Sequence, residues 1–173
     1  VLIARIVSAT AGVGTIAVTW AIGRRFISPA AGLMAAAFAA VTPMSVLQTH
    51  YASVDVLLEL TTSLTILATC NLFYAASPTS ALLAGAAAGL AMSTKYTGLQ
   101  CIVLPLFAAA ASYYRTRSRQ RTAILVGGVA VAAVAVAGLA CPPCLMNPSR
   151  VQFRMAGHAA AASGEILYFR NNQ

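Results

Sequence analysis

Long apolar blocks separated by short polar breaks constrain this chain more than any other feature. Five blocks are nearly free of charge: Leu2–Ile22, Ala30–Leu47, Val56–Ala76, Ala81–Tyr114 and Thr122–Ala140. Only 8% of the 173 residues are charged, whereas a soluble domain carries about 25%, so too few charges exist to cover a water-facing surface. Because about 20 apolar residues in a helix cross a bilayer, the sequence predicts an all-α, polytopic transmembrane helix bundle.

The fourth block, Ala81–Tyr114, is too long for one crossing, because a helix of that length would extend about 50 Å. Basic residues in short loops stay on the cytoplasmic side of a membrane. This rule places the loops containing Arg24 and Arg115 on the same side, which requires the fourth block to cross twice. A turn near Lys95–Gln100 satisfies the rule, and the bundle then has about six helices.

This topology collects the remaining ionisable residues at the opposite, extracytoplasmic face. Arg5 lies near the outer end of the first helix, and His50, Asp55 and Lys95 lie in or beside outer loops. Glu59 lies one helical turn deeper than Asp55, on the same side of its helix. The sequence predicts an integral multi-pass protein of the plasma or inner membrane whose active face is extracytoplasmic.

The domain boundary is predicted where the last apolar block ends. Residues 1–141 form the transmembrane helix bundle, and residues 142–173 form an extracytoplasmic segment. Cys141 and Cys144 have the spacing of a redox or metal pair, but no partner pair accompanies them. Val1 lies inside an apolar run without a preceding methionine, so we expect the chain to be an internal fragment of a larger membrane domain.

The charged residues also have simpler interpretations. Asp55 can cap a helix N-terminus, His50 can be an ordinary interfacial residue, and Lys95 can extend its ammonium toward water. Arg5 can serve as an anchor at the membrane edge. The net charge of +8 comes largely from arginine-rich loops, which favour contact with anionic membrane lipids and not with nucleic acid.

Two motifs carry a resemblance to a known family. The stretch "HYASVDVLL" and, about forty residues later, "AGAAAGLAMSTKYTGL" resemble the paired signature S-H-F-A-T-x-D-V-P-L and A-G-L-A-A-G-L-A-x-S-T-K-Y-N. This signature belongs to the polyprenyl-phosphate-sugar-dependent membrane glycosyltransferases, which include protein O-mannosyltransferases and aminoarabinose transferases. The resemblance is specific at "HYASVD" and "STKYTG" and extends more weakly from Arg5 to about Gly164.

The resemblance implies a GT-C architecture and sugar transfer from a polyprenyl-phosphate donor to a lipid, glycan or protein acceptor in the cell envelope. It implies site roles for Asp55, Lys95 and His50, with Asp55 as a second acidic residue that orients the acceptor or holds a divalent metal. It implies that Lys95 is a cation near the donor phosphate, and the charge and outer position of Arg5 make that residue a second candidate for the same contact. The family's catalytic carboxylate lies in a first external loop, which would precede Val1, so this fragment is expected to be inactive alone.

Two departures from the family pattern stand out. Leu57 replaces the usual proline, and Glu59 has no recognised counterpart. Two other classes of protein fit the composition: a membrane transporter or lipid flippase fragment, and a non-catalytic structural membrane subunit. A transporter favours discontinuous helices and a midplane site, whereas the charges here gather at one face.

Overall fold

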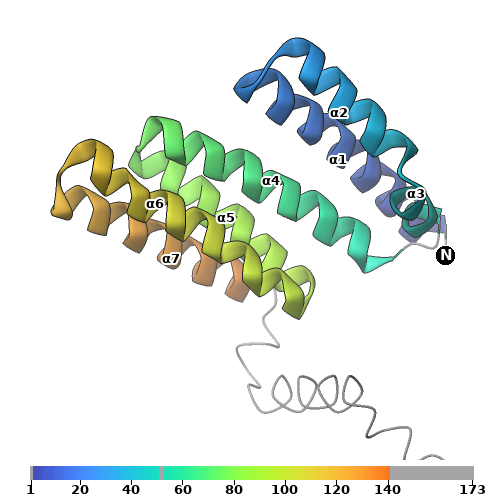
Figure 1. The fold of residues 1–173 in the computed structure, drawn as a ribbon. Coiled ribbons are helices and arrows are strands. Elements are labelled where there is room, and N and C mark those ends of the chain that lie inside the picture. The colour runs from blue at the N-terminus through green and yellow to red at the C-terminus, as the bar shows by residue number, and fades with distance from the viewer. Residues whose placement is uncertain (1, 51–52, 141–173) are drawn as a thin grey trace, which may run out of the picture. The chain divides into compact units, whose positions relative to one another are not determined.

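The structure is a computed structural model, and it describes residues 2–50 and 53–140. Within these ranges every regular element is a helix, so the all-α prediction is confirmed (Figure 1). The elements in chain order are α1 (Leu2–Phe26), α2 (Pro29–Val41), α3 (Pro43–His50), α4 (Val54–Ala75), α5 (Pro78–Thr94), the 3₁₀-helix η1 (Tyr96–Ile102), α6 (Val103–Thr116) and α7 (Arg119–Ala140).

The helix boundaries fall at the predicted polar breaks. Ser28 and Ser77 accept hydrogen bonds from the first turns of α2 and α5, and a proline follows each of them at the first helical position. Proline is tolerated there because its missing N–H would have no partner inside the helix. Ala76 and Arg117 adopt left-handed backbone conformations, which end α4 and α6.

The split of the fourth apolar block is confirmed. The helix α5 ends at Thr94, η1 begins at Tyr96, and α6 continues from η1. Four segments of the described chain are long and apolar enough to cross a membrane: Leu2–Phe26, Val54–Ala75, Tyr96–Thr116 and Arg119–Ala140. The helix α5 has 17 residues, at the lower end of the range of about 17–25 residues that span a bilayer.

The second apolar block is not one continuous helix, which corrects the expectation for Ala30–Leu47. It is divided into α2 and α3, whose axes differ by 54°. Pro43 explains the break, because it has no N–H to donate to the carbonyl of Ala39. The N–H of Thr42 contacts that carbonyl instead, over 3.4 Å. If the bent pair counts as one crossing, the described residues contain up to five spans by length and composition.

Residues 1–137 form one compact unit, and the turns that carry arginines share one end of it (Figure 1). At this end Phe26 of α1 stacks on Tyr74 of α4, with ring centroids 5.4 Å apart. Arg115 of α6 donates a hydrogen bond to the carbonyl oxygen of Phe73. The first turn of α4 and η1 lie at the opposite end of the unit. This separation of basic turns from the Asp55 end agrees with the predicted topology.

Small residues let the helices pack closely. A Cβ added to Gly23 of α1 would lie 2.5 Å from the Cα of Gly32 in α2. Likewise, a Cβ on Gly85 of α5 would lie 2.3 Å from the carbonyl oxygen of Val129 in α7. Large apolar side chains such as Phe107 are exposed instead. This inversion of the soluble pattern suits a bundle surrounded by lipid, where close backbone approach drives helix packing.

Residues 138–173 group into a second unit. Residues 141–173 lie outside the described part of the chain, and with them Cys141, Cys144 and the predicted extracytoplasmic segment. The predicted domain boundary therefore stays a prediction.

Candidate functional site at the end of α4

The sequence around Asp55 fixes how α4 begins. Ser53 is the N-cap, and its hydroxyl oxygen accepts a hydrogen bond of 3.1 Å from the backbone N–H of Asp55. The same hydroxyl donates to Oδ2 of Asp55 over 3.1 Å. The capping role considered for Asp55 is therefore filled by Ser53. Asp55 lies in the first turn, where a carboxylate also meets the positive end of the helix dipole.

Lys95 is positioned by the break between α5 and η1. It is the C-cap residue of α5, with extended backbone angles (φ −156°, ψ 147°), and its carbonyl accepts a 2.8 Å hydrogen bond from Gly98. Gly98 is buried against the last turns of α5, and a Cβ there would lie 2.0 Å from the carbonyl oxygen of Ala91. Only glycine lets η1 fold this closely onto α5, so Gly98 fixes the turn that presents Lys95.

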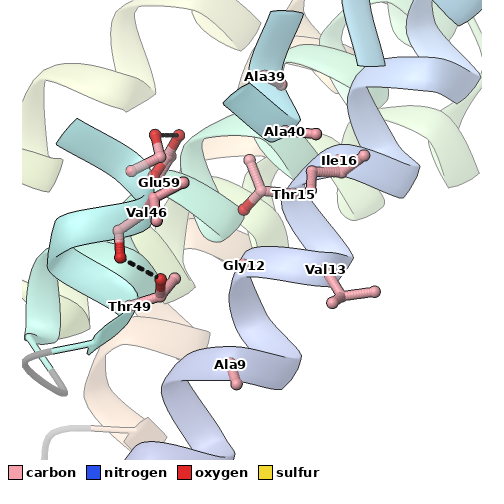
Figure 2. Close-up of a pocket in the computed structure, with 11 residues that line it drawn as sticks. Ala9, Gly12, Val13, Thr15, Ile16, Ala39, Ala40, Val46, Thr49 and Glu59 are labelled. Carbon is pink, nitrogen blue, oxygen red and sulfur yellow. Dashed lines mark hydrogen bonds between the residues drawn. The ribbon is translucent and has the colours of Figure 1, made fainter. Parts of the chain in front are cut away.

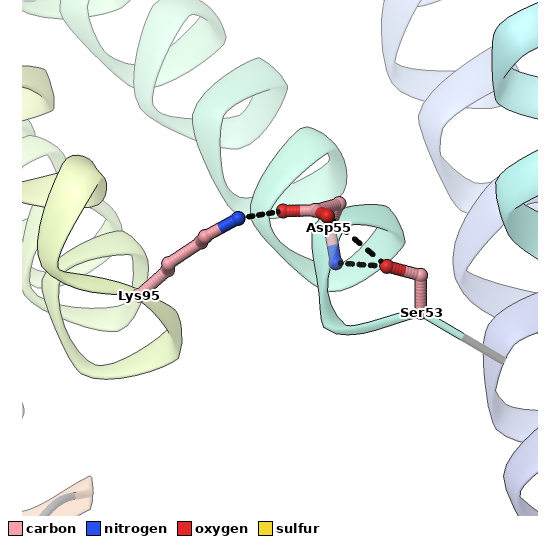
Figure 3. Close-up of polar contacts among 3 residues, drawn as sticks. All are labelled: Ser53, Asp55 and Lys95. Carbon is pink, nitrogen blue, oxygen red and sulfur yellow. Dashed lines mark hydrogen bonds and ion pairs between the residues drawn. The ribbon is translucent and has the colours of Figure 1, made fainter. Parts of the chain in front are cut away.

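These two elements bring Asp55 and Lys95 together although forty residues separate them (Figure 3). The Nζ atom of Lys95 lies 2.6 Å from Oδ1 of Asp55. About a third of each side chain is exposed, 36% for Lys95 and 34% for Asp55, so an incoming ligand can reach the pair. The hydrogen bond to Asp55 and the charge of that carboxylate raise the pKa of Lys95 and so further favour its ammonium form.

A cavity lies between α1, the α2–α3 break and α4 (Figure 2). Its volume is about 190 Å³, and Glu59 is the acidic residue in its lining. The Oε1 atom of Glu59 accepts a 2.9 Å hydrogen bond from Ser45 of α3. Glu59 was singled out in the sequence for its depth, and the structure places it against a cavity.

A protein-family model described as dolichyl-phosphate-mannose-protein mannosyltransferase matches residues 2–139. This range includes the two sequence motifs that contain Asp55 and Lys95. The chain belongs to this family. Comparisons with curated proteins and with solved structures gave no match. Membership agrees with the resemblance drawn from the two motifs and identifies the chain as part of a multi-pass membrane glycosyltransferase family.

For this mannosyltransferase-family chain, the expected proximity of Asp55 and Lys95 is confirmed. His50 ends α3 and is exposed, and Arg5 is exposed near the start of α1. The catalytic role predicted for His50 and the donor-phosphate contact predicted for Arg5 stay predictions.

The described residues do not by themselves form a metal centre. Residues 2–50 and 53–140 contain no group of three or more His, Cys, Asp or Glu side chains that could hold a metal ion. Both carboxylate oxygens of Asp55 are already occupied by hydrogen bonds, one from Lys95 and one from Ser53. The predicted metal role of Asp55 stays a prediction.

Sequence reasoning missed three contributors to this family member's site. Ser53 orients Asp55, Gly98 fixes the turn at Lys95, and Ser45 contacts Glu59. Ser53 and Gly98 both lie inside the recognised motifs, and a serine two residues before an acidic residue at a helix start is a capping signal. The contact of Ser45 carries no local signal, because it depends on how α3 packs on α4.

Proposed function

We infer that this chain contributes to an enzyme that transfers a sugar from a polyprenyl-phosphate-linked donor to an acceptor hydroxyl. The observation that carries the proposal is the ion pair between Asp55 and Lys95, which joins the two motifs that mark the family. The family's description names a dolichyl phosphate sugar as donor and a protein as acceptor. Donors of this class share a phosphate that leaves from the sugar, whichever sugar and acceptor this member uses.

Lys95 is the proposed contact for the donor phosphate. It is the one lysine of the chain, and it lies at the end of a helix hairpin, where a lipid-anchored phosphate at the membrane edge can reach it. Cleavage of the sugar–phosphate bond leaves negative charge on the phosphate oxygens. A positioned ammonium stabilises that charge more strongly at a membrane edge than in bulk water.

Asp55 is proposed to hold Lys95 in place and protonated until a donor arrives. A phosphate that enters the site offers Lys95 a second anionic partner, and the carboxylate of Asp55 is then free to accept a hydrogen bond from the acceptor hydroxyl. This exchange suits a partly exposed pair, because neither charge has to be buried without a partner. The general base of the reaction is not assigned to the described residues.

The extracytoplasmic placement of the site rests on charge distribution. Arg24, Arg25 and Arg115 lie at the end of the unit opposite to Asp55 and Lys95. By the rule that short basic loops remain cytoplasmic, the ion pair faces the other side of the membrane. A lipid-linked donor presented on that face would meet Lys95 directly.

The transporter interpretation gains one structural feature, the bent pair α2–α3, because discontinuous helices are common at transport sites. Family membership and the position of the ion pair at one end of the unit favour the transferase. The transporter interpretation remains useful as the alternative outcome of the experiment below.

The test is sugar transfer by the full-length protein in membranes, measured with a radiolabelled polyprenyl-phosphate sugar. We expect Lys95→Ala and Asp55→Ala each to reduce transfer by about a hundredfold, the usual effect of losing a group that stabilises transition-state charge. Lys95→Arg should restore activity only in part, because a planar guanidinium differs in shape from an ammonium. The double variant should be little worse than either single variant, because the two residues act as a unit.

Arg119→Ala is the matched control, since it removes one positive charge at the opposite end of the unit and leaves the ion pair intact. Expression and membrane insertion should be equal in all variants. Normal transfer by the double variant would overturn the proposal, and it would make a transport or scaffold role the better explanation of the ion pair.

A further inference from the structure

The cavity between α1, the α2–α3 break and α4 has a polar lining that accepts hydrogen bonds but offers few donors (Figure 2). Ser45 uses its hydroxyl hydrogen on Oε1 of Glu59 over 2.9 Å. Thr49 donates to the carbonyl oxygen of Val46 over 2.7 Å, and Thr15 donates to that of Ala11 over 3.1 Å. The other lining residues carry apolar side chains or none. A ligand that binds here must therefore bring its own hydrogen-bond donors.

The charge of the cavity points to a cation. Glu59 lies one turn further into α4 than Asp55, within a segment apolar enough to span a membrane. The ion pair found among residues 2–50 and 53–140 joins Asp55 to Lys95, whereas the hydrogen bond of Glu59 is with the neutral Ser45. An acidic side chain at such depth is expensive unless it gains a positive partner or faces a functional cavity.

The size and opening of the cavity favour the end of an amphipathic molecule. Its volume of about 190 Å³ corresponds to roughly six water molecules at about 30 Å³ each, enough for an ammonium group and its first methylenes. Val13 and Val46 line the cavity and are 66% and 54% exposed. An alkyl chain can therefore leave the cavity along these valines toward the bilayer.

The break at Pro43 borders the cavity, because residues before and after it belong to the lining. The carbonyl oxygen of Ala39, a lining residue, accepts only a long 3.4 Å contact from Thr42 because Pro43 has no N–H. Irregular backbone within a membrane span occurs where it is buried in protein or lines a cavity.

From these observations we propose that the cavity binds the protonated primary amino group of an amphipathic amine, with Glu59 as its counter-charge. The inference is independent of the proposed transferase function, since it uses no contact of Asp55 or Lys95. The ammonium can belong to a membrane lipid headgroup or to a free long-chain amine, and the experiment separates these sources.

The experiment measures retention of radiolabelled dodecylammonium by the purified full-length protein. Dodecyltrimethylammonium, which has the charge but no N–H donor, and dodecanol, which has a donor but no charge, should each compete at least about tenfold less well than unlabelled dodecylammonium. Equal competition by either compound would overturn the proposal. If phosphatidylethanolamine competes and phosphatidylcholine does not, the ligand is a lipid headgroup; if neither competes, it is a free amine.

Glu59→Gln should weaken dodecylammonium binding by about tenfold or more, since it removes the charge and keeps the shape. Asp55→Asn is the matched control, because it removes the same charge one helical turn away and should leave amine binding unchanged. An equal loss in both variants would indicate a general negative field and would overturn the cavity as the site.

Gly12→Ala is a second variant that keeps the carboxylate. Its added Cβ would lie 2.6 Å from Cγ2 of Thr49, which also lines the cavity, so one of these groups must shift, and we expect binding to weaken severalfold. Thermal unfolding of each variant separates loss of the site from loss of the fold. If Glu59→Gln and Gly12→Ala both fold and bind dodecylammonium as the unaltered protein does, the proposal is wrong.

Discussion

Replacing Gly98 by alanine is the sharpest test of how the fold positions Lys95. The added Cβ would lie 2.0 Å from the carbonyl oxygen of Ala91, 2.4 Å from its carbonyl carbon and 3.0 Å from the backbone nitrogen of Met92. Carbon and oxygen atoms normally stay at least about 3.3 Å apart, so η1 must move away from α5 by more than about 1 Å. All three neighbours are backbone atoms of a helix, and none can rotate aside.

The cost follows from this geometry. Overpacking costs about 1–3 kcal/mol, and we expect the upper part of that range because the contact is with backbone. The better helix propensity of alanine returns at most about 1 kcal/mol. The larger effect should be on activity, since a displacement of about 1 Å at a positioned group can reduce a rate by about a hundredfold.

The assay is sugar transfer by the full-length protein, together with its thermal unfolding in detergent. Gly127→Ala is the matched control, because nothing lies within 4 Å of the Cβ that it adds to α7; it should keep activity and slightly raise stability. If Gly98→Ala behaved like Gly127→Ala in both measurements, the packing of η1 on α5 would not be what positions Lys95, and the reasoning would fail.

Three further predictions address the topology and the ion pair. Reporter fusions after Arg25 and Arg121 should give cytoplasmic signals and a fusion after Gln100 an external one; a cytoplasmic signal after Gln100 would contradict the hairpin of α5 and α6. In a protein whose four native cysteines are replaced by alanine, cysteines introduced at positions 55 and 95 should be crosslinked by a short bifunctional reagent. Cysteines at positions 55 and 119 should not be crosslinked by the same reagent. If reagents of every length failed at positions 55 and 95, the two motifs would not lie close together. Because Asp55 raises the pKa of Lys95, the ammonium form persists at a pH where an ordinary lysine has begun to lose its proton. Only the neutral amine reacts with an acylating reagent, so Asp55→Asn should make Lys95 react faster at mildly alkaline pH. Since Lys95 is the one lysine of the chain, peptide mass spectrometry reads this reaction directly, and equal rates in the two proteins would argue against the ion pair.

The sequence alone determined the class of fold and the grouping of charges. Apolar blocks of about twenty residues require helices in a membrane, because only internally hydrogen-bonded segments are stable in lipid. The arginine loops then constrained the topology strongly enough to split Ala81–Tyr114 at Lys95, as the structure has it. The two motifs identified the family, and their shared face predicted that Asp55 would meet Lys95.

The tertiary structure decided what the local pattern could not express. Hydropathy predicts one apolar segment over Ala30–Leu47, yet Pro43 divides it into α2 and α3, and residues of both helices line a cavity. The partner of Glu59 is Ser45, and the sequence gives no sign of this because the contact depends on how α3 packs against α4. The need for glycine at position 98 likewise arises from the approach of η1 to the backbone of α5. Hydropathy and charge report where a residue lies relative to water and lipid, whereas contacts between helices depend on the shapes of both surfaces, which only the packed bundle specifies.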